Sequence, residues 1–214
     1  MLDHTELKGN RVLIIGPNCE YIAIRISDAF SEVNIISDEY NSILQYRMKV
    51  KAQDKIKVKM MDYTHTDFTD EYFDLIFAQS SISNHERKNI LKEIKRIISS
   101  EGIICIGEIV SLTDQVPQFV DDIWEQSNLE PIYAPDIKNF YKGKGFEVLS
   151  ERDHSATLKD FYEKAKSAAA KIDKKEQEQN KKYFSRIKHE SNAYLKHGGD
   201  KYIGFKSLIM RKSN

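Results

Sequence analysis

The segment that most constrains the fold is Arg11–Glu20, with the sequence RVLIIGPNCE. Its apolar residues 12–15 have the length and composition of a buried strand, and the run ends abruptly at Gly16. A helical pattern begins directly afterwards, with apolar positions at Cys19, Ile22, Ala23 and Ile26. In open α/β sheets a strand, a glycine turn and a helix form a nucleotide-binding unit, because the turn places the ligand at the helix N-terminus. We therefore expect an α/β fold with a ligand near Gly16.

The size and charge of the chain limit its class. Its 214 residues suffice for one well-buried core, so we expect a single domain over residues 1–214. The 33 basic and 33 acidic residues cancel, which argues against nucleic-acid binding through bulk electrostatics. No apolar run approaches the ~20 residues needed to span a bilayer, and no signal-peptide pattern opens the chain. We expect a cytoplasmic protein with no membrane or nucleic-acid partner.

The two cysteines, Cys19 and Cys105, lack the spacing of a metal site, so no metal is expected. Cys105 lies in an apolar run and is interpreted as a core residue. Cys19 starts the first helix, where the helix dipole can lower a thiol pKa. A simple packing role for Cys19 is the favoured alternative.

Strand and helix patterns alternate along the first half of the chain. After the first helix, Cys19–Phe30, further strands are predicted at Val33–Ser37, Ile56–Met61, Phe73–Ala78 and Ile103–Val110. Helices are predicted at Tyr40–Val50, with Ile43, Leu44, Arg47 and Met48 at helical spacing, and at His85–Ser99, which Glu101-Gly102 ends. Strands separated by helices of ten or more residues form βαβ units, so a mainly parallel sheet is expected. The alternation of apolar and basic residues in Ile56–Met61 favours a place near the sheet edge.

The second half is richer in helix. Helices are predicted at Gln115–Gln126 and Asp136–Lys144, followed by a strand at Phe146–Leu149. The segment Thr157–Lys196 predicts two helices joined by the charged stretch Asp173–Lys182. The apolar face of the first of them is expected at Leu158, Phe161, Ala165, Ala168, Ala169 and Ile172. A final strand is predicted at Tyr202–Met210.

Polar residues follow the predicted strands where ligands bind in open α/β sheets. Asp38 lies about 20 residues past Gly16, the spacing at which an acid accepts hydrogen bonds from ribose hydroxyls. Asp62 follows the third strand, where a carboxylate can accept from the amine of adenine, and Tyr63 can stack on the ring. The alternative is that these acids cap the helices that follow them.

Taken in order, these segments resemble the class I methyltransferases that use S-adenosylmethionine. The nearest group is the small-molecule enzymes related to those of quinone biosynthesis. The segments that carry the resemblance are RVLIIGPN, VNIISDE, KVKMMDY, EYFDLIFAQSSISN, LKEIKRIISSEGIICIGEIV, NFYKGKGFEVLSERD and KYIGFKSLIMRK. The resemblance implies a three-layer Rossmann-like fold with a mostly parallel seven-stranded sheet and an antiparallel C-terminal strand. It divides the chain into a cofactor-binding core (11–110), a helical connection (113–145), a helical insertion or lid (155–197) and a final strand (201–212).

The resemblance also implies a binding site for S-adenosylmethionine. Its residues would be Gly16, Pro17 and Asn18 at the methionine end, Ser37 or Asp38 at the ribose, Asp62 and Tyr63 at the adenine, and Gln79 and Ser80 on the pocket floor. His85 and Glu108 are the candidates by position for a general base. The alternatives are a surface histidine at position 85 and a turn or cap residue at position 108.

The chain departs from the family pattern in its first motif. Ile14 stands where the family usually carries an acid, and Asn18 and Glu20 stand at positions of further glycines. Each adds a side chain where backbone approaches the ligand. Glu20 also brings negative charge near the cofactor carboxylate unless it points away.

Three functions follow from this pattern. The first is methyl transfer from S-adenosylmethionine to a small-molecule acceptor, with residues 155–197 as an acceptor lid. The second is a non-catalytic methyltransferase-like protein that acts as a partner or assembly subunit. The third is another nucleotide-binding enzyme, such as a dehydrogenase. The insertion could also pack on the sheet or form a homodimer face.

Overall fold

The computed structural model describes residues 9–213 apart from 17, 52, 174–177 and 179. Its first half consists of β1 (Gly9–Ile15), α1 (Cys19–Ile26), β2 (Phe30–Ser37), α2 (Tyr40–Lys49), β3 (Ile56–Met60), β4 (Phe73–Gln79), α3 (Arg87–Ile97) and β5 (Ile98–Ser111). The second half consists of α4 (Gln118–Gln126), β6 (Ile132–Tyr133), α5 (Ile137–Gly143), β7 (Phe146–Asp153), α6 (Thr157–Lys171), α8 (Lys181–Lys196) and β8 (Ile203–Lys212). Short 3-10 turns occupy Ser27–Ala29, Ala134–Asp136 and Gly199–Lys201.

The strands form one sheet in the order β3-β2-β1-β4-β5-β8-β7, and β6 pairs with β5. The first five strands in this order are parallel to one another, and the C-terminal strands are antiparallel. β3 is the edge strand, as its alternating sequence predicts. The Rossmann-like fold with a mostly parallel sheet is therefore confirmed. Among the described residues the sheet also gains the short strand β6, which the sequence pattern does not predict.

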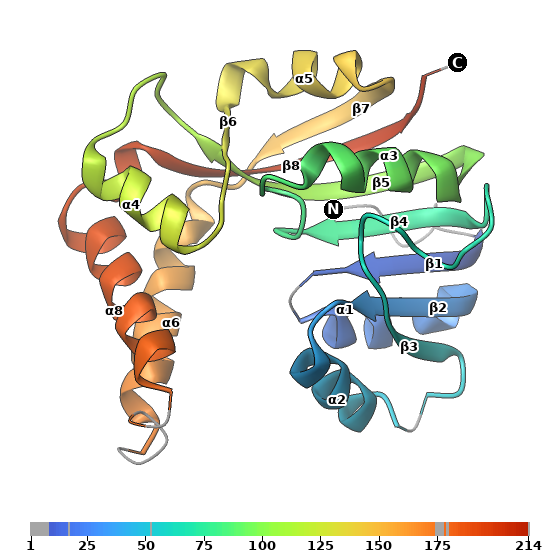
Figure 1. Ribbon diagram of the computed structural model, residues 1–214, viewed down its shortest axis with the longest axis horizontal. Coiled ribbons are helices and arrows are strands. Elements are labelled where there is room, and N and C mark those ends of the chain that lie inside the picture. Colours follow the sequence, from blue (N-terminus) through green and yellow to red (C-terminus); the bar gives the residue numbers. More distant parts are fainter. Residues whose placement is uncertain (1–8, 17, 52, 174–177, 179, 214) are drawn as a thin grey trace. The chain divides into compact units, whose positions relative to one another are not determined.

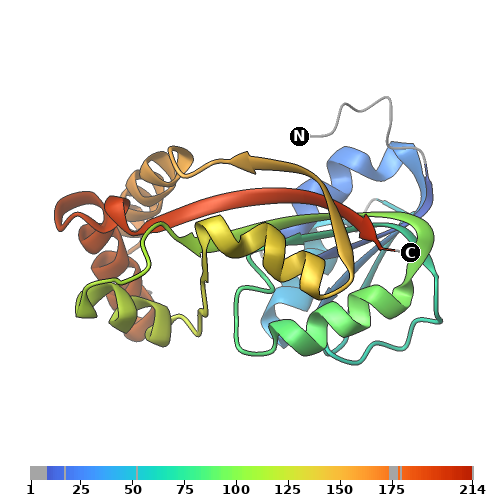
Figure 2. The same cartoon turned by 90° about the horizontal axis from the view of Figure 1, so that it is seen from above.

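The chain divides into two compact units. The first contains the chain up to Glu108, Lys138–Glu151 and the residues from Ser207 onward. In this unit α1 covers one face of the sheet, and α3 and α5 cover the other (Figure 1, Figure 2). Residues 12–15 of β1 are all buried, because helices on both faces exclude water from a central parallel strand.

The second unit contains Ile109–Ile137 and Arg152–Lys206. Its helices α6 and α8 form an antiparallel pair against which α4 packs (Figure 1). The core of this unit is apolar and aromatic, and it consists of Val120, Ile123, Trp124, Leu158, Tyr162, Ala193, Tyr194 and Ile203. The rings of Tyr162 and Tyr194 stack with centroids 4.6 Å apart. The prediction of two helices in 157–196 is confirmed, and residues 174–177 and 179 of their junction lie outside the described residues.

Two predicted apolar faces are wrong. On α2 the buried side chains are Ile43 and Tyr46, whereas Leu44 is 41 % and Met48 78 % exposed. On α6 the buried side chains are Leu158 and Tyr162, whereas Phe161 is 59 % exposed. In both helices two sets of apolar residues have helical spacing, and only contact with the neighbouring elements decides which set is buried.

The predicted turn at Glu101-Gly102 is also wrong, because both residues lie inside β5. β5 begins directly after α3, and its register against β4 shifts between the pairs Phe73–Ile98 and Leu75–Ile103. The extra residues form an irregularity of the β-bulge type, where glycine is common. A Cβ on Gly102 would lie 2.6 Å from the side chain of Ile98, so a larger residue would force that side chain to move.

Candidate functional site

The candidate site lies at the carboxyl ends of β2, β1 and β4, all in the first unit. Ile15 pairs with both Ile36 and Ala78, so the residues that follow them, Gly16, Ser37 and Gln79, stand at one level of the sheet. From β1 the chain continues to β2 and β3 on one side, and it later returns to β4 on the other. Ligands of open α/β sheets bind at such a switch point.

Gly16 makes the close turn after β1. Its φ is +122°, a conformation that other residues rarely adopt. A Cβ at this position would lie only 2.4 Å from the carbonyl oxygen of Gln79. The glycine therefore allows the loop after β1 to touch the end of β4.

The carbonyl oxygen of Gly16 accepts hydrogen bonds from two side chains. The Cys19 thiol donates at 2.6 Å, and the Tyr46 hydroxyl from α2 donates at 3.1 Å. Burial raises the pKa of Cys19 to about 12, so this thiol stays protonated and has a packing role. Tyr46 is not among the site residues that the sequence predicts, and it is 6 % exposed. Its spacing from Ile43 along one helix face is the only sequence signal that marks it.

Ser37 and Tyr63 contact each other beside this loop. The Ser37 hydroxyl accepts from the backbone N–H of Glu39 at 3.1 Å and hydrogen-bonds with the Tyr63 phenol. Burial raises the pKa of Tyr63, and the phenol is close enough to Asp38, Cys19 and Tyr46 to interact electrostatically with them. Three predicted site residues, Ser37, Asp38 and Tyr63, are thus brought together.

The two predicted acids differ in how their carboxylates are used. Asp38 is exposed at the end of β2, and no group within the described part of the chain donates a hydrogen bond to it. Asp62 accepts hydrogen bonds at Oδ1 from the backbone N–H of Thr64 at 2.7 Å and from its hydroxyl at 2.8 Å. These bonds lower the pKa of Asp62, which stays ionised. One oxygen of this carboxylate therefore holds the loop after β3 through its bonds to Thr64.

The two unusual residues of the first motif, Asn18 and Glu20, lie in different environments. Asn18 is exposed in the left-handed region, with φ 56° and ψ 31°, immediately before α1. Pro17 lies outside the described residues. Glu20 is 2 % exposed, and its Oε1 pairs with Nζ of Lys49 on α2 at 2.6 Å. The charge that Glu20 adds to the first motif is therefore compensated from α2.

The loop after β4 is held at both ends by serines. The Ser81 hydroxyl donates to the carbonyl of Ile15 at 3.3 Å, and the Ser83 hydroxyl donates to Glu108. Between these anchors and Gln79, Ser80 has a positive φ of 53°, and its N–H donates to Gly107 at 2.9 Å. Side chains and backbone of β1 and β5 thus determine the shape of this loop.

Glu108, one of the candidate bases, is fully buried. Its carboxylate accepts from Ser83, from Tyr141 on α5, and from Arg87 at 3.3 and 3.4 Å. Both oxygens are used, and Arg87 is itself 5 % exposed. This arrangement suits a buried ion pair that joins β5, α3 and α5. The other candidate, His85, is 64 % exposed and lies 3.6 Å from Glu86.

A glycine turn and an acid at neighbouring strand ends, at a switch point of a parallel sheet, are typical of Rossmann-like folds. Residues 15–106 match the methyltransferase domain family, and these residues contain most of the site. This part of the chain is therefore similar to methyltransferase domains. No match to the chain was found among curated proteins.

Solved structures share the fold over nearly the whole chain. The cyclase SpnF aligns with a TM-score of 0.81 and 21% identity, covering 97% of this chain and 77% of that one. The phosphoethanolamine N-methyltransferase 2 of Haemonchus contortus, solved with S-adenosyl-L-methionine, aligns with a TM-score of 0.76 and 16% identity. The alignment covers 97% of this chain and 49% of that one. The geranyl diphosphate C-methyltransferase of Streptomyces coelicolor aligns with a TM-score of 0.74 and 10% identity. The alignment covers 98% of this chain and 74% of that one. A cyclase among these structures shows that the fold alone does not determine the reaction.

No helix of the described residues has the length and apolar character needed to cross a membrane.

Proposed function

We propose that this protein transfers the methyl group of S-adenosylmethionine to a small-molecule acceptor. The observation that carries the proposal is the common level of Gly16, Ser37 and Gln79 at the switch point of the sheet. The family match covers this region, and two of the three neighbours described above were solved with the cofactor or its demethylated form, S-adenosyl-L-homocysteine. These two neighbours act on small molecules according to their names.

The residues present fit this cofactor. In the proposal Gly16 and Asn18, with Pro17, hold its methionine end, and Asp38 accepts from its ribose because its carboxylate acceptors are unused within the described residues. Ser37 positions Tyr63, which lies with Asp62 at the adenine, and Gln79 and Ser80 line the floor. Lys49 compensates Glu20, so the anionic end of an amino acid would meet less repulsion than the first motif by itself implies.

The reaction would be a direct displacement. When bound, the cofactor supplies a sulfonium whose methyl carbon is attacked by the acceptor, while the pair of electrons of the broken carbon–sulfur bond returns to sulfur. The chain then contributes alignment and exclusion of water. His85 is the candidate to accept a proton from the acceptor, because Glu108 is buried with both oxygens occupied. An amine or thiolate acceptor needs no such base.

Titration with S-adenosylmethionine, followed by thermal unfolding and calorimetry, tests the proposal. We expect saturable binding, and we expect Asp38→Ala to weaken it about tenfold or more, since a charged hydrogen bond is worth about 1.5–3 kcal/mol. Asp54→Ala is the matched control, because Asp54 is an exposed acid just before β3, at the opposite end of the strands.

No binding at millimolar S-adenosylmethionine would overturn the proposal and favour a non-catalytic partner protein. Stabilisation by NAD instead would favour a dehydrogenase. Equal weakening by Asp38→Ala and Asp54→Ala would remove Asp38 from the site.

A further inference from the structure

The second unit contains a hollow of about 1210 Å³ beside α8 and the end of α4. It is lined by Gln126, Asn180, Lys181, Lys182, Tyr183, Ser185, Arg186 and His189. Half of these side chains are basic, the others are polar, and none of them is acidic. The balanced charge of the whole chain therefore hides a local concentration of positive charge.

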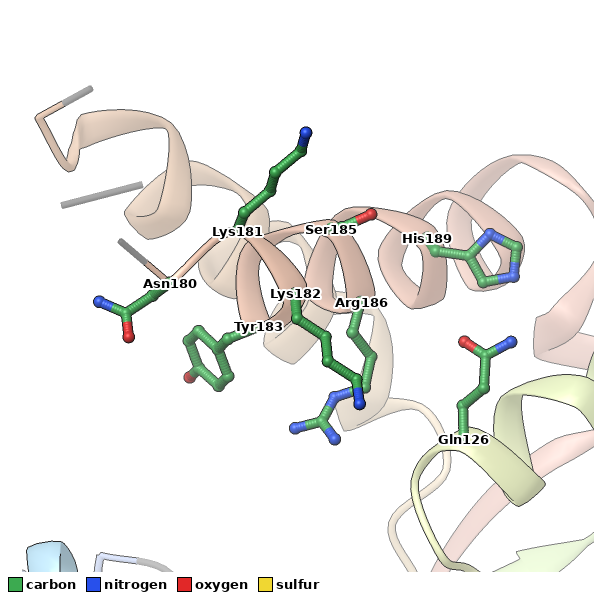
Figure 3. A pocket seen from close by; sticks show the side chains of 8 residues that line it. All are labelled: Gln126, Asn180, Lys181, Lys182, Tyr183, Ser185, Arg186 and His189. Carbon is green, nitrogen blue, oxygen red and sulfur yellow. The ribbon is translucent and has the colours of Figure 1, made fainter. Parts of the chain in front are cut away.

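The basic residues of α8 fall on different faces. Lys182, Arg186 and His189 are separated by four and three residues, so they follow one side of the helix. Figure 3 shows Lys182 and Arg186 pointing to the same side of α8, whereas Lys181 points to the opposite side. Gln126, the last residue of α4, extends toward this part of α8 from the other wall. Side chains from two helices thus converge on the hollow.

The charge of this face is incompletely compensated. The Nε of Arg186 lies 3.8 Å from a carboxylate oxygen of Glu190, and the same oxygen accepts a hydrogen bond from Ser127 at 2.6 Å. Lys182 has no ion-pair partner within the part of the chain that the structure describes. The first turn of α8 contains Lys181 and Lys182 and no acidic residue. Cations at this end of a helix are unfavourable because the helix dipole is positive there. A bound anion would offset both this repulsion and the incompletely paired charge of Lys182 and Arg186.

From this convergence we infer that the hollow binds a compact anion with several oxygens, of the phosphate or diphosphate class. Lys182 would supply a point charge and Arg186 a planar pair of N–H donors, the combination that recognises phosphate oxygens. His189 and Gln126 would supply additional N–H groups from the two walls. The inference rests on the second unit alone and is independent of methyl transfer.

Calorimetric titration of the full chain with inorganic pyrophosphate tests the inference. We expect saturable binding by the wild-type chain and a loss of about tenfold or more in the double variant Lys182→Gln/Arg186→Gln, since both cations that would contact the anion are removed. Glutamine retains helix propensity, so α8 should persist in the variant.

The matched control is Lys188→Gln/Lys196→Gln, which removes the same charge from the same helix. Both lysines are exposed, and neither lines the hollow. This control should bind pyrophosphate within about twofold of wild type, because non-specific attraction would respond to both pairs alike. Melting temperatures of both variants show that the fold is retained.

Absence of saturable wild-type binding at millimolar pyrophosphate would overturn the inference, as would equal loss in the two double variants. Inorganic phosphate is titrated alongside, and stronger binding of pyrophosphate would identify the diphosphate class. An oligonucleotide that binds far more tightly than pyrophosphate and is lost in both variants would replace the small anion with a nucleic-acid surface.

Discussion

The hydroxyl of Tyr46, in α2, donates a hydrogen bond to the carbonyl oxygen of Gly16 at 3.1 Å. The two residues are 30 positions apart, and the bond joins the helix after β2 to the loop after β1. Tyr46 thereby holds the glycine turn in the shape on which the proposed cofactor site depends.

Tyr46→Phe should lower the free energy of unfolding by about 1 kcal/mol, the usual contribution of one hydrogen bond. If the proposed function is correct, the affinity for S-adenosylmethionine should also fall, because the turn becomes looser. Urea unfolding and calorimetric titration measure the two effects. Tyr40→Phe is the control, since Tyr40 begins the same helix and is 61 % exposed. Equal behaviour of the two variants would contradict a role for the Tyr46 hydroxyl.

Gly16→Ala should destabilise the fold by about 2–4 kcal/mol, because it combines a strained backbone with a steric clash. The added Cβ would meet the Gln79 carbonyl at 2.4 Å. Gly143→Ala provides the comparison, because a Cβ there has nothing within 4 Å and the residue lies in α5. That variant should be neutral or slightly more stable, by up to about 1 kcal/mol. Chemical denaturation measures the free energy of unfolding of both variants, and equal values would contradict the prediction.

Lys49→Met should cost about 1.5–3 kcal/mol, since it removes the cation that is hydrogen-bonded to the buried carboxylate of Glu20. The double variant Glu20→Met/Lys49→Met should recover most of this loss, because it also removes the buried carboxylate that needs a partner. A double-mutant cycle of unfolding free energies measures the coupling. Additive losses in the two single variants would show that the pair contributes nothing to stability.

The stability of the protein should decrease in acid through Glu93. Burial by itself would raise the pKa of Glu93, but hydrogen bonds from Arg96 and Thr66 outweigh it and lower the pKa from 4.5 to about 2. Because the pKa is lower in the folded chain, this contribution is complete above pH 4.5 and is lost as the pH falls toward 2. Glu93→Gln should be less stable than wild type at pH 7 and should lose less stability between pH 5 and about 3. Parallel unfolding curves for the two proteins across this range would refute the assignment.

Much of the fold follows from local patterns. Apolar runs such as Val33–Ser37 and the apolar stripe of Ile90, Leu91 and Ile94 predict strands and helices within a few residues of their observed bounds. Their alternation implies a parallel sheet, because short helical crossovers return the chain in the same direction. The faces of α2 and α6 could not be predicted in the same way. Each helix carries two sets of apolar residues at helical spacing, and the neighbours that select one set are distant in sequence.

The candidate site was likewise predictable in its position along the chain but not in its side-chain contacts. The sequence by itself places Gly16, Asp38 and Asp62 after successive strands, and a parallel sheet brings such positions to one edge. Only the tertiary structure decides how their groups are used: Asp38 remains open within the described residues, whereas Asp62 bonds to Thr64. Likewise, contacts between elements turn Glu20 toward Lys49 and bury Glu108 against Arg87. The physical reason is that side-chain charges and hydrogen bonds act over a few ångströms of space, whereas the periodicity of a sequence reports only on neighbours along the chain.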